Sequence, residues 1–128
     1  MLELRPREPV GLADDFGALV AWYIKALGFA AVSIIDEAYR YATLETAGGV
    51  RLGIADARQT EVHAGDRARN TVVLQFEVDD VAAFFERVAS QGGLVTFGPA
   101  QDAEAEFWFG GIADLEGNRC WAVDANCP

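Results

Sequence analysis

This sequence of 128 residues holds little of what most catalytic and metal sites use, because it has one histidine and two cysteines. The cysteines, Cys120 and Cys127, show no CxxC spacing, so the sequence predicts neither a disulfide framework nor a zinc site. We expect His63 to lie in a solvated loop rather than to act as a metal ligand or general base. With one histidine, neither a His-paired nucleophile nor a facial metal triad is available.

Basic residues and long apolar runs are also scarce. Ten basic residues stand against 20 acidic ones, and the net charge of −10 repels phosphate backbones, which argues against nucleic-acid binding. No apolar run reaches the roughly 18 residues of a membrane span, and residues 1–10 are charged where a secretory signal needs an apolar core. We therefore expect a cytoplasmic protein with no membrane partner. The acidic balance favours a cationic ligand mildly, although solubility alone is a sufficient reason for it.

Hydrophobic residues, by contrast, make up 52% of the chain, which is enough for the core of one domain. In residues 15–27, and again in 79–91, they recur at the spacing of an amphipathic helix, with aspartate at the start and glycine after the end. The two predicted helices lie roughly 64 residues apart, half of the chain, which indicates an internal duplication.

Strand-like segments surround each predicted helix in the same order. They are residues 9–13, 29–35, 39–46 and 50–55 in the first half, and 71–78, 94–98, 107–113 and 119–124 in the second. Between the last two, Asp114 and Asn118 can bond to the backbone of a tight turn and Gly117 can take a positive φ. The sequence thus predicts an α+β fold, a single domain of two tandem β-α-β-β-β units (about 1–58 and 71–128) joined by residues 59–70. Because a helix covers one face of each sheet, we expect the curved mixed sheets to surround a cleft with their other faces.

Three motifs resemble those of the vicinal oxygen chelate superfamily, which includes glyoxalase I, extradiol dioxygenases, and the fosfomycin and bleomycin resistance proteins. They are AWYIKALGF at residues 21–29, FEVDDV at 76–81, and the segment 108–118. Together they span nearly the whole chain and support the predicted fold. The resemblance also implies a homodimer. In the members that do chemistry, it implies a divalent metal held by four side chains, commonly His or Glu, on the first and last strands of each unit.

The residues at these four positions do not predict a metal site. They are Glu8, Val73, Trp121 and the strand at 50–55, which has no carboxylate or imidazole; Asp56 lies just beyond its end. Because valine and tryptophan offer no lone pair to a metal, at most two oxygen ligands remain. We therefore expect no metal and no cofactor, and the sequence favours binding over catalysis.

Aromatic side chains then become the predicted binding site. Trp121 is the first choice, because it occupies a position that points at the metal in the enzymes that the chain resembles. Strand alternation places Phe107 and Phe109 on one face and Trp108 on the other, and the sequence does not decide which face meets the cleft. The other predicted ligand-binding residues are Gln75 and Glu77, which share a face, Tyr41, and Arg51 as the cation of the cleft.

The leading hypothesis is a metal-independent protein that binds a planar or cationic small molecule, for example to sequester an antibiotic, as the resemblance to bleomycin resistance proteins implies. One alternative is a glyoxalase-type or dioxygenase-type lyase, isomerase or oxygenase with an atypical site built on Glu8, Glu77 or Glu106. Another is a regulator that has lost ligand binding and fills its cleft with its own side chains.

Overall fold

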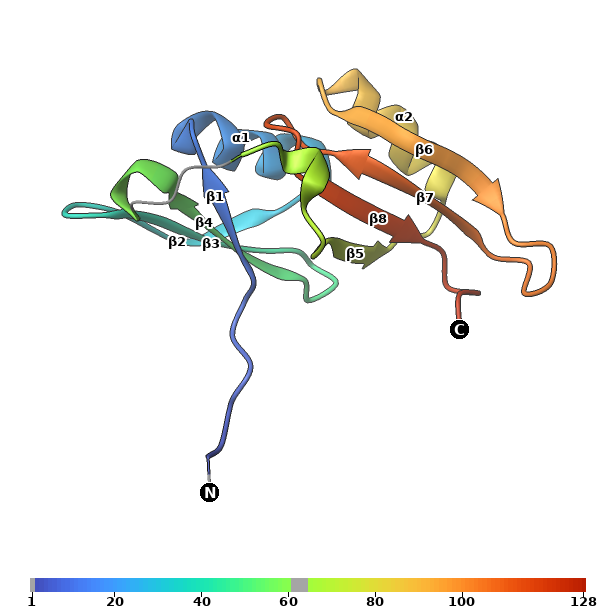
Figure 1. Ribbon diagram of the computed structural model, residues 1–128, viewed down its shortest axis with the longest axis horizontal. Coiled ribbons are helices and arrows are strands. Elements are labelled where there is room, and N and C mark those ends of the chain that lie inside the picture. The colour runs from blue at the N-terminus through green and yellow to red at the C-terminus, as the bar shows by residue number, and fades with distance from the viewer. Residues whose placement is uncertain (1, 61–64) are drawn as a thin grey trace. The chain divides into compact units, whose positions relative to one another are not determined.

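The computed structural model describes residues 2–60 and 65–128, which form two compact units of the same topology (Figure 1). His63, which we expected in a solvated loop, lies outside the described residues. Unit 1 contains β1 (Val10–Ala13), α1 (Phe16–Leu27), β2 (Ala30–Asp36), β3 (Arg40–Glu45) and β4 (Arg51–Asp56). Unit 2 contains β5 (Leu74–Glu77), α2 (Val81–Ser90), β6 (Leu94–Gln101), β7 (Trp108–Ala113) and β8 (Arg119–Val123). The predicted α+β fold of two tandem β-α-β-β-β units is confirmed.

Each unit forms one four-stranded mixed sheet. The strand order is β1-β4-β3-β2 in unit 1 and β5-β8-β7-β6 in unit 2. In both sheets the first strand pairs in parallel with the last, and the remaining neighbours are antiparallel. The last strand of each unit is therefore central, with a neighbour on either side, so its side chains lie in the middle of the sheet.

Both helices lie within the predicted ranges, 15–27 and 79–91, and α2 begins two residues later than predicted. The carboxylate of Asp15 accepts a hydrogen bond from the N–H of Ala18, and Asp80 does the same for Ala83, so each aspartate caps its helix. Gly28 ends α1 in the left-handed conformation, with φ of 76°. No helix in the described part of the chain is long and apolar enough to cross a membrane.

The strand boundaries differ from the prediction at two places in unit 2. The strand predicted at 71–78 is shorter, so that Val73 precedes β5 instead of lying in it. The strand predicted at 94–98 continues to Gln101, because register shifts after Val95 and after Phe97 absorb the residues that break its pattern. The turn after β7 is as predicted: Asp114 accepts from the N–H groups of Glu116 and Asn118, and Gly117 has φ of 93°.

Helix α2 covers one face of the sheet of unit 2. Its Phe85 and Val88 are buried, and so are Ile112 of β7 and Ala122 of β8. A Cβ atom at Gly110 would collide with the ring of Phe85, so glycine is required there for the helix to lie this close to β7. The other face of the sheet is left for the site described next.

Candidate functional site

Side chains of β8 alternate between the two faces of the sheet of unit 2. Cys120 and Ala122 are buried on the face toward α2, whereas the indole of Trp121 is 47% exposed on the opposite face. Register pairs Trp121 with Gln75 of β5 on one side and with Gly111 of β7 on the other. The centre of this open face is therefore aromatic.

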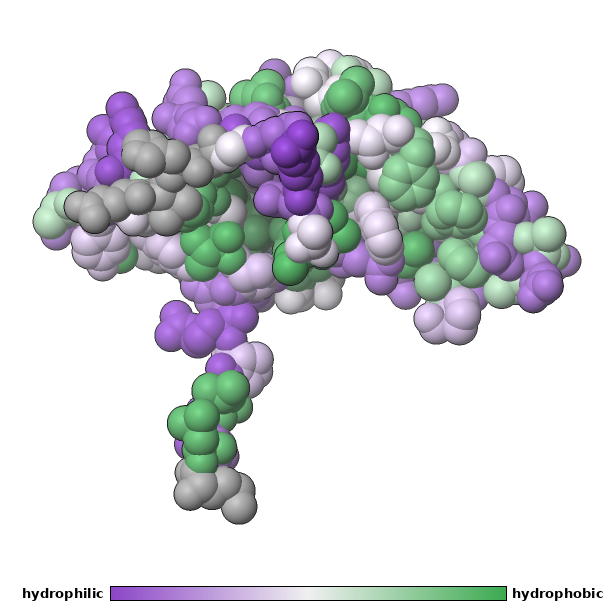
Figure 2. Space-filling view, viewed as in Figure 1, coloured by the Kyte–Doolittle hydropathy of each residue, from purple (hydrophilic) through white to green (hydrophobic). Residues whose placement is uncertain are grey.

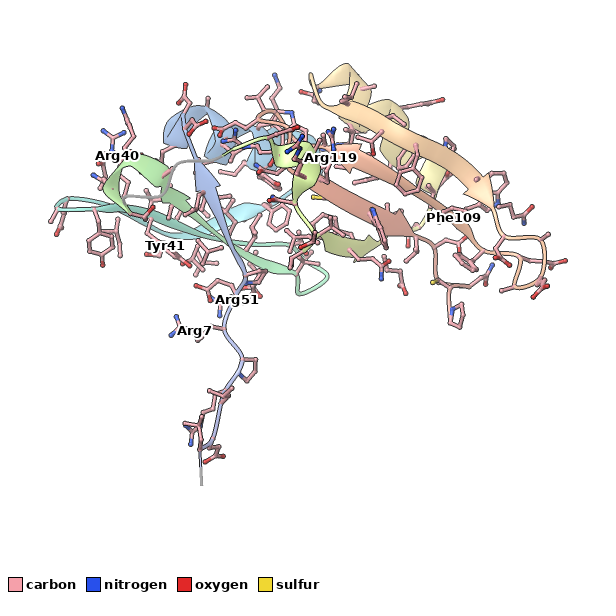
Figure 3. All side chains as sticks on the ribbon, viewed as in Figure 1. Arg7, Arg40, Tyr41, Arg51, Phe109 and Arg119 are labelled. Atoms are coloured by element: carbon pink, nitrogen blue, oxygen red, sulfur yellow. The ribbon has the colours of Figure 1, made fainter. Side chains whose placement is uncertain are left out.

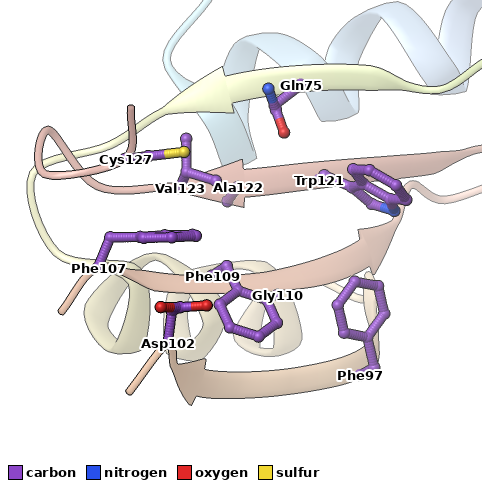
Figure 4. Close-up of a pocket in the computed structure, with 10 residues that line it drawn as sticks. All are labelled: Gln75, Phe97, Asp102, Phe107, Phe109, Gly110, Trp121, Ala122, Val123 and Cys127. Carbon is purple, nitrogen blue, oxygen red and sulfur yellow. The ribbon is translucent and has the colours of Figure 1, made fainter. Parts of the chain in front are cut away.

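An aromatic pocket of about 350 Å³ opens on this face, wholly within unit 2 (Figure 4). Space-filling atoms coloured by hydropathy show apolar side chains gathered over the strands of unit 2 (Figure 2). The pocket is lined by Gln75, Phe97, Asp102, Phe107, Phe109, Gly110, Trp121, Ala122, Val123 and Cys127. Strands β5 to β8 and the segments that follow β6 and β8 thus all contribute to it.

Four aromatic rings form a continuous wall of this pocket. The ring centroid of Phe97 lies 6.3 Å from Trp121 at an interplanar angle of 86°, and 6.5 Å from Phe109. The next contact joins Phe109 to Phe107, with centroids 5.7 Å apart. Edge-to-face and tilted contacts of this kind stabilise each ring position. The wall is therefore formed by contacts among its own rings.

Glycine at position 111 allows this arrangement. A Cβ atom there would collide with the ring of Phe97 and with the hydroxyl of Thr96. Without it, the ring of Phe97 lies over the backbone of β7, where it meets the edge of Trp121. A small residue opposite Trp121 thus makes room for the second ring of the wall.

Among the described residues, the pocket is lined by the polar side chains of Gln75, Asp102 and Cys127, besides the indole N–H of Trp121. The carboxylate oxygen Oδ1 of Asp102 accepts hydrogen bonds from the N–H groups of Glu104 and Ala105, at 3.0 and 2.8 Å. Figure 4 shows this carboxylate beside the ring of Phe109. The Cys127 thiol also faces the pocket, whereas the other cysteine, Cys120, is only 1% exposed.

The structure brings together four of the eight predicted ligand-binding residues, which are Trp121, Phe107, Phe109 and Gln75. Glu77 shares their face by register but lies outside the pocket lining, and Trp108 lies on the opposite face of β7, 43% exposed. Tyr41 and Arg51 belong to unit 1 (Figure 3).

Sequence reasoning missed Phe97, Asp102 and Cys127. Phe97 carries a usable signal, since it lies in a predicted strand and antiparallel pairing with the aromatic strand β7 brings it next to Trp121. Asp102 and Cys127 lie outside the strands and belong to no motif, so their place depends on how the chain turns after β6 and β8.

In unit 1, the corresponding face is occupied by the chain itself. Tyr41 is paired with Ala55 just as Phe109 is paired with Val123, so Gly53 is the counterpart of Trp121. The ring of Tyr41 lies across Gly53, where a Cβ atom would collide with its hydroxyl. That hydroxyl donates a hydrogen bond of 2.8 Å to Oε1 of Glu8, whose side chain is only 5% exposed.

Arg51 lies near this pair and lines a separate cavity of about 310 Å³ with the segment 6–9. Its guanidinium is 3.7 Å from the carboxylate of Glu45, and both side chains are about half exposed. Arg7, in the same cavity, lies 3.6 Å from the Glu8 carboxylate. The predicted cation is therefore present, but in unit 1 and beside acidic partners.

Hydrogen bonding shifts the acidity of this pair in opposite directions. The backbone N–H of Glu8, followed by the Tyr41 hydroxyl, holds the pKa of the Glu8 carboxyl below its ordinary value. Burial, together with the hydrogen bond to the Glu8 carboxylate, raises the pKa of the Tyr41 hydroxyl. Glu8 is thus ionised and engaged at neutral pH.

This pair predicts a pH-dependent contribution to stability. A carboxyl whose pKa is lower in the folded state stabilises the fold above its unfolded pKa, here near 4.5, and loses that contribution as the pH falls through the folded value. We expect Glu8→Gln to lower the thermal midpoint at neutral pH, and the difference from the wild type to shrink below a pH of about 4.5.

Thermal unfolding followed by circular dichroism across this pH range measures the effect. Glu3→Gln is the matched control, since the Glu3 side chain is 74% exposed, and it should change the midpoint little at any pH. An equal deficit of Glu8→Gln at neutral and acid pH would contradict the assigned role of the Glu8 carboxylate.

A family model described as the Glyoxalase/Bleomycin resistance protein/Dioxygenase superfamily matches residues 12–121 of this chain, which is most of its length. The chain belongs to this superfamily. The match does not separate the bleomycin resistance branch, which the motifs led us to favour, from the others. Curated protein sequences give no match.

Solved structures of the superfamily share the fold. A glyoxalase family protein from Bacillus cereus is 12% identical with a TM-score of 0.81, and the match covers 97% of this chain and 95% of that one. A glyoxalase/bleomycin resistance protein/dioxygenase family enzyme from Burkholderia phytofirmans PsJN is 18% identical with a TM-score of 0.71, covering 90% and 94%. At such identities the likeness shows the fold alone.

The residues of this superfamily member do not fit the divalent metal that the resemblance implies. Val73 and Trp121 cannot ligate, and an oxygen of Glu8 already accepts from the Tyr41 hydroxyl. Asp56 is the last residue of β4, but it is buried and bonded to Arg58, whose guanidinium lowers the pKa of the Asp56 carboxyl. Within residues 2–60 and 65–128, no three His, Cys, Asp or Glu side chains gather closely enough to hold a metal.

The three carboxylates on which the alternative enzyme hypothesis depends have different surroundings. Glu8 is engaged in unit 1, while Glu77 and Glu106 are exposed in unit 2 and neither lines the pocket. The arrangement therefore offers a preformed aromatic pocket, and the described residues that line it include no acid and base pair.

Proposed function

We propose that this superfamily member binds a planar small molecule in the aromatic pocket of unit 2, without a metal. The observation that carries the proposal is the wall of four rings, Trp121, Phe97, Phe109 and Phe107, around an open volume of about 350 Å³. Ligand sites in proteins are concave, mostly apolar and largely preformed, with a few polar groups that orient the ligand. The pocket has each of these features.

Binding without chemistry agrees with the polar groups of the lining. Gln75 and Asp102 can orient a ligand, and among residues 2–60 and 65–128 no imidazole or amine lines the pocket to activate the Cys127 thiol. Sequestration of a toxic compound such as an antibiotic requires affinity alone, and we propose it as the biological role. The homodimer implied by the resemblance is part of the same proposal, and light scattering of the purified chain tests it.

Alkylation of Cys127 reports on occupancy of this pocket. Because Cys120 is buried, Cys127 is the accessible thiol of the chain, and its side chain lines the pocket. We expect saturating 1-methylquinolinium, a planar bicyclic probe, to slow the reaction of Cys127 with iodoacetamide about fivefold or more, because the ligand covers the thiol. Mass spectrometry of the alkylated chain measures the rate.

The Cys127→Ser variant identifies the alkylated position, since it should react only after unfolding. Sorbitol, which is uncharged, not planar and of similar mass, serves as the control compound and should leave the rate unchanged. If neither 1-methylquinolinium nor its uncharged analogue 4-methylquinoline protects Cys127 or releases heat on mixing, the proposed function is wrong.

A further inference from the structure

We infer that the ligand of this pocket is a compact organic cation, two fused aromatic rings in size, whose positive charge lies against the carboxylate of Asp102. This inference rests on the proposed function and adds the charge, size and orientation of the ligand. It follows from the position of Asp102, the charges around it and the volume of the pocket.

Asp102 is held in place by its own loop. Its backbone N–H donates to the carbonyl of Phe107 at 2.9 Å, and its carbonyl accepts from the N–H of Glu106 at 3.0 Å. Its side-chain oxygen Oδ1 accepts the two N–H groups of Glu104 and Ala105. In the described part of the chain no donor bonds to Oδ2. A carboxylate has acceptor capacity on both oxygens, so a fixed acceptor remains for a ligand.

The surroundings of Asp102 favour positive charge. In the part of the chain that the structure describes, no lysine or arginine lines the pocket, so none competes for the carboxylate there. The loop from β6 to β7 adds Glu104 and Glu106 and contains no basic residue. Phe107 and Phe109 lie beside Asp102, and a cation over an aromatic face gains further attraction. The net charge of −10 acts in the same direction at longer range.

The volume limits the size of the ligand. At about 350 Å³ the pocket lies near the lower end of the 300–1,000 Å³ range of small-molecule sites, so a large glycopeptide does not fit inside it. Asp102 and Phe107 lie at one end of the pocket, and Phe97 and Trp121 lie at the other (Figure 4). A flat bicyclic cation can therefore place its charge at Asp102 and its rings against Trp121, with Gln75 available for one hydrogen bond.

Isothermal titration calorimetry with 1-methylquinolinium and 4-methylquinoline tests the inference, because these probes share a flat bicyclic shape and differ in charge above neutral pH. We expect the wild type to bind the cation about tenfold more tightly than the neutral probe, through charge attraction to Asp102 and to the aromatic faces. Asp102→Asn keeps an oxygen that can accept the same two N–H groups but removes the charge. It should weaken cation binding about tenfold and change neutral binding less than about twofold.

Glu104→Gln is the matched control, because it removes the same unit of charge from the same loop outside the pocket lining. Its affinity for the cation should stay within about twofold of the wild type. Equal binding of both probes by the wild type would overturn the inference and leave the proposed function standing, whereas binding of neither would overturn both. Equal losses in Asp102→Asn and Glu104→Gln would also overturn the role of Asp102. If a variant fails to fold, the affinities of the wild type for the two probes still test whether the pocket prefers a cation.

Discussion

Trp121→Ala is expected to weaken the binding of 1-methylquinolinium about 30-fold, or about 2 kcal/mol, while changing the free energy of unfolding little. The indole forms the end of the pocket wall away from Asp102, so its removal takes away both apolar area and a stacking surface. It is 47% exposed, so the fold loses little buried contact. Calorimetry measures the affinity, and urea denaturation measures the stability.

Trp108→Ala is the matched control for this prediction. Trp108 has the same side chain, is 43% exposed, and lies in the neighbouring strand on the opposite face of the sheet. We expect its affinity to remain within about twofold of the wild type. An equal loss of affinity in both variants would contradict the pocket as described, and it would return Trp108 to the binding site that the sequence predicts.

Phe85→Ala is expected to lower the free energy of unfolding by about 3–5 kcal/mol, the largest effect on stability among the predictions here. The ring is 3% exposed and lies over Gly110, in the space that a Cβ atom would need. No neighbouring backbone can move into that space, because β7 is hydrogen-bonded on both sides, so a cavity remains. Since small domains are stable by about 5–15 kcal/mol, a large part of the stability is lost.

Urea denaturation monitored by circular dichroism gives this value, with the slope of the transition unchanged if the native state is intact. Phe84→Ala is the control, because Phe84 is the neighbouring residue on α2 and is only partly buried. It should cost less than half as much as Phe85→Ala. Equal losses at the two positions would contradict the close contact between Phe85 and Gly110.

In each unit an aromatic ring lies across a glycine of a neighbouring strand, with a different result. In unit 1 an aromatic residue of β3, Tyr41, lies across a glycine of β4 and is held by Glu8. In unit 2 the glycine is Gly111 of β7, and the ring that lies across it is Phe97 of β6, beside Trp121 of the last strand. The hypothesis of a site filled by its own side chains therefore describes unit 1, whereas unit 2 keeps an open pocket.

The fold could be predicted from the sequence because its signals are local. Aspartates before and glycines after the apolar stripes mark both helices, and Asp114, Gly117 and Asn118 mark the last turn. The predicted strand boundaries were wrong where pairing between strands overrides the local sequence pattern. In β6, register shifts carry the strand past Gly98 and Pro99, where the local pattern predicts its end. The place of Trp121 could be predicted because it follows the turn between Asp114 and Asn118 at a short, fixed distance along the chain.

By itself the sequence determined two β-α-β-β-β units and an acidic, histidine-poor chain, because each depends on composition or on spacing along the chain. That Trp121 stands where a metal ligand is expected is what the resemblance to the superfamily implies. Only the tertiary structure decided which face of β7 is open, that Phe97 and Asp102 join Trp121, and that Tyr41 pairs with Glu8. The face depends on where α2 packs, and the partners depend on strand register and loop closure. These are contacts between residues far apart in the chain, which no local pattern encodes.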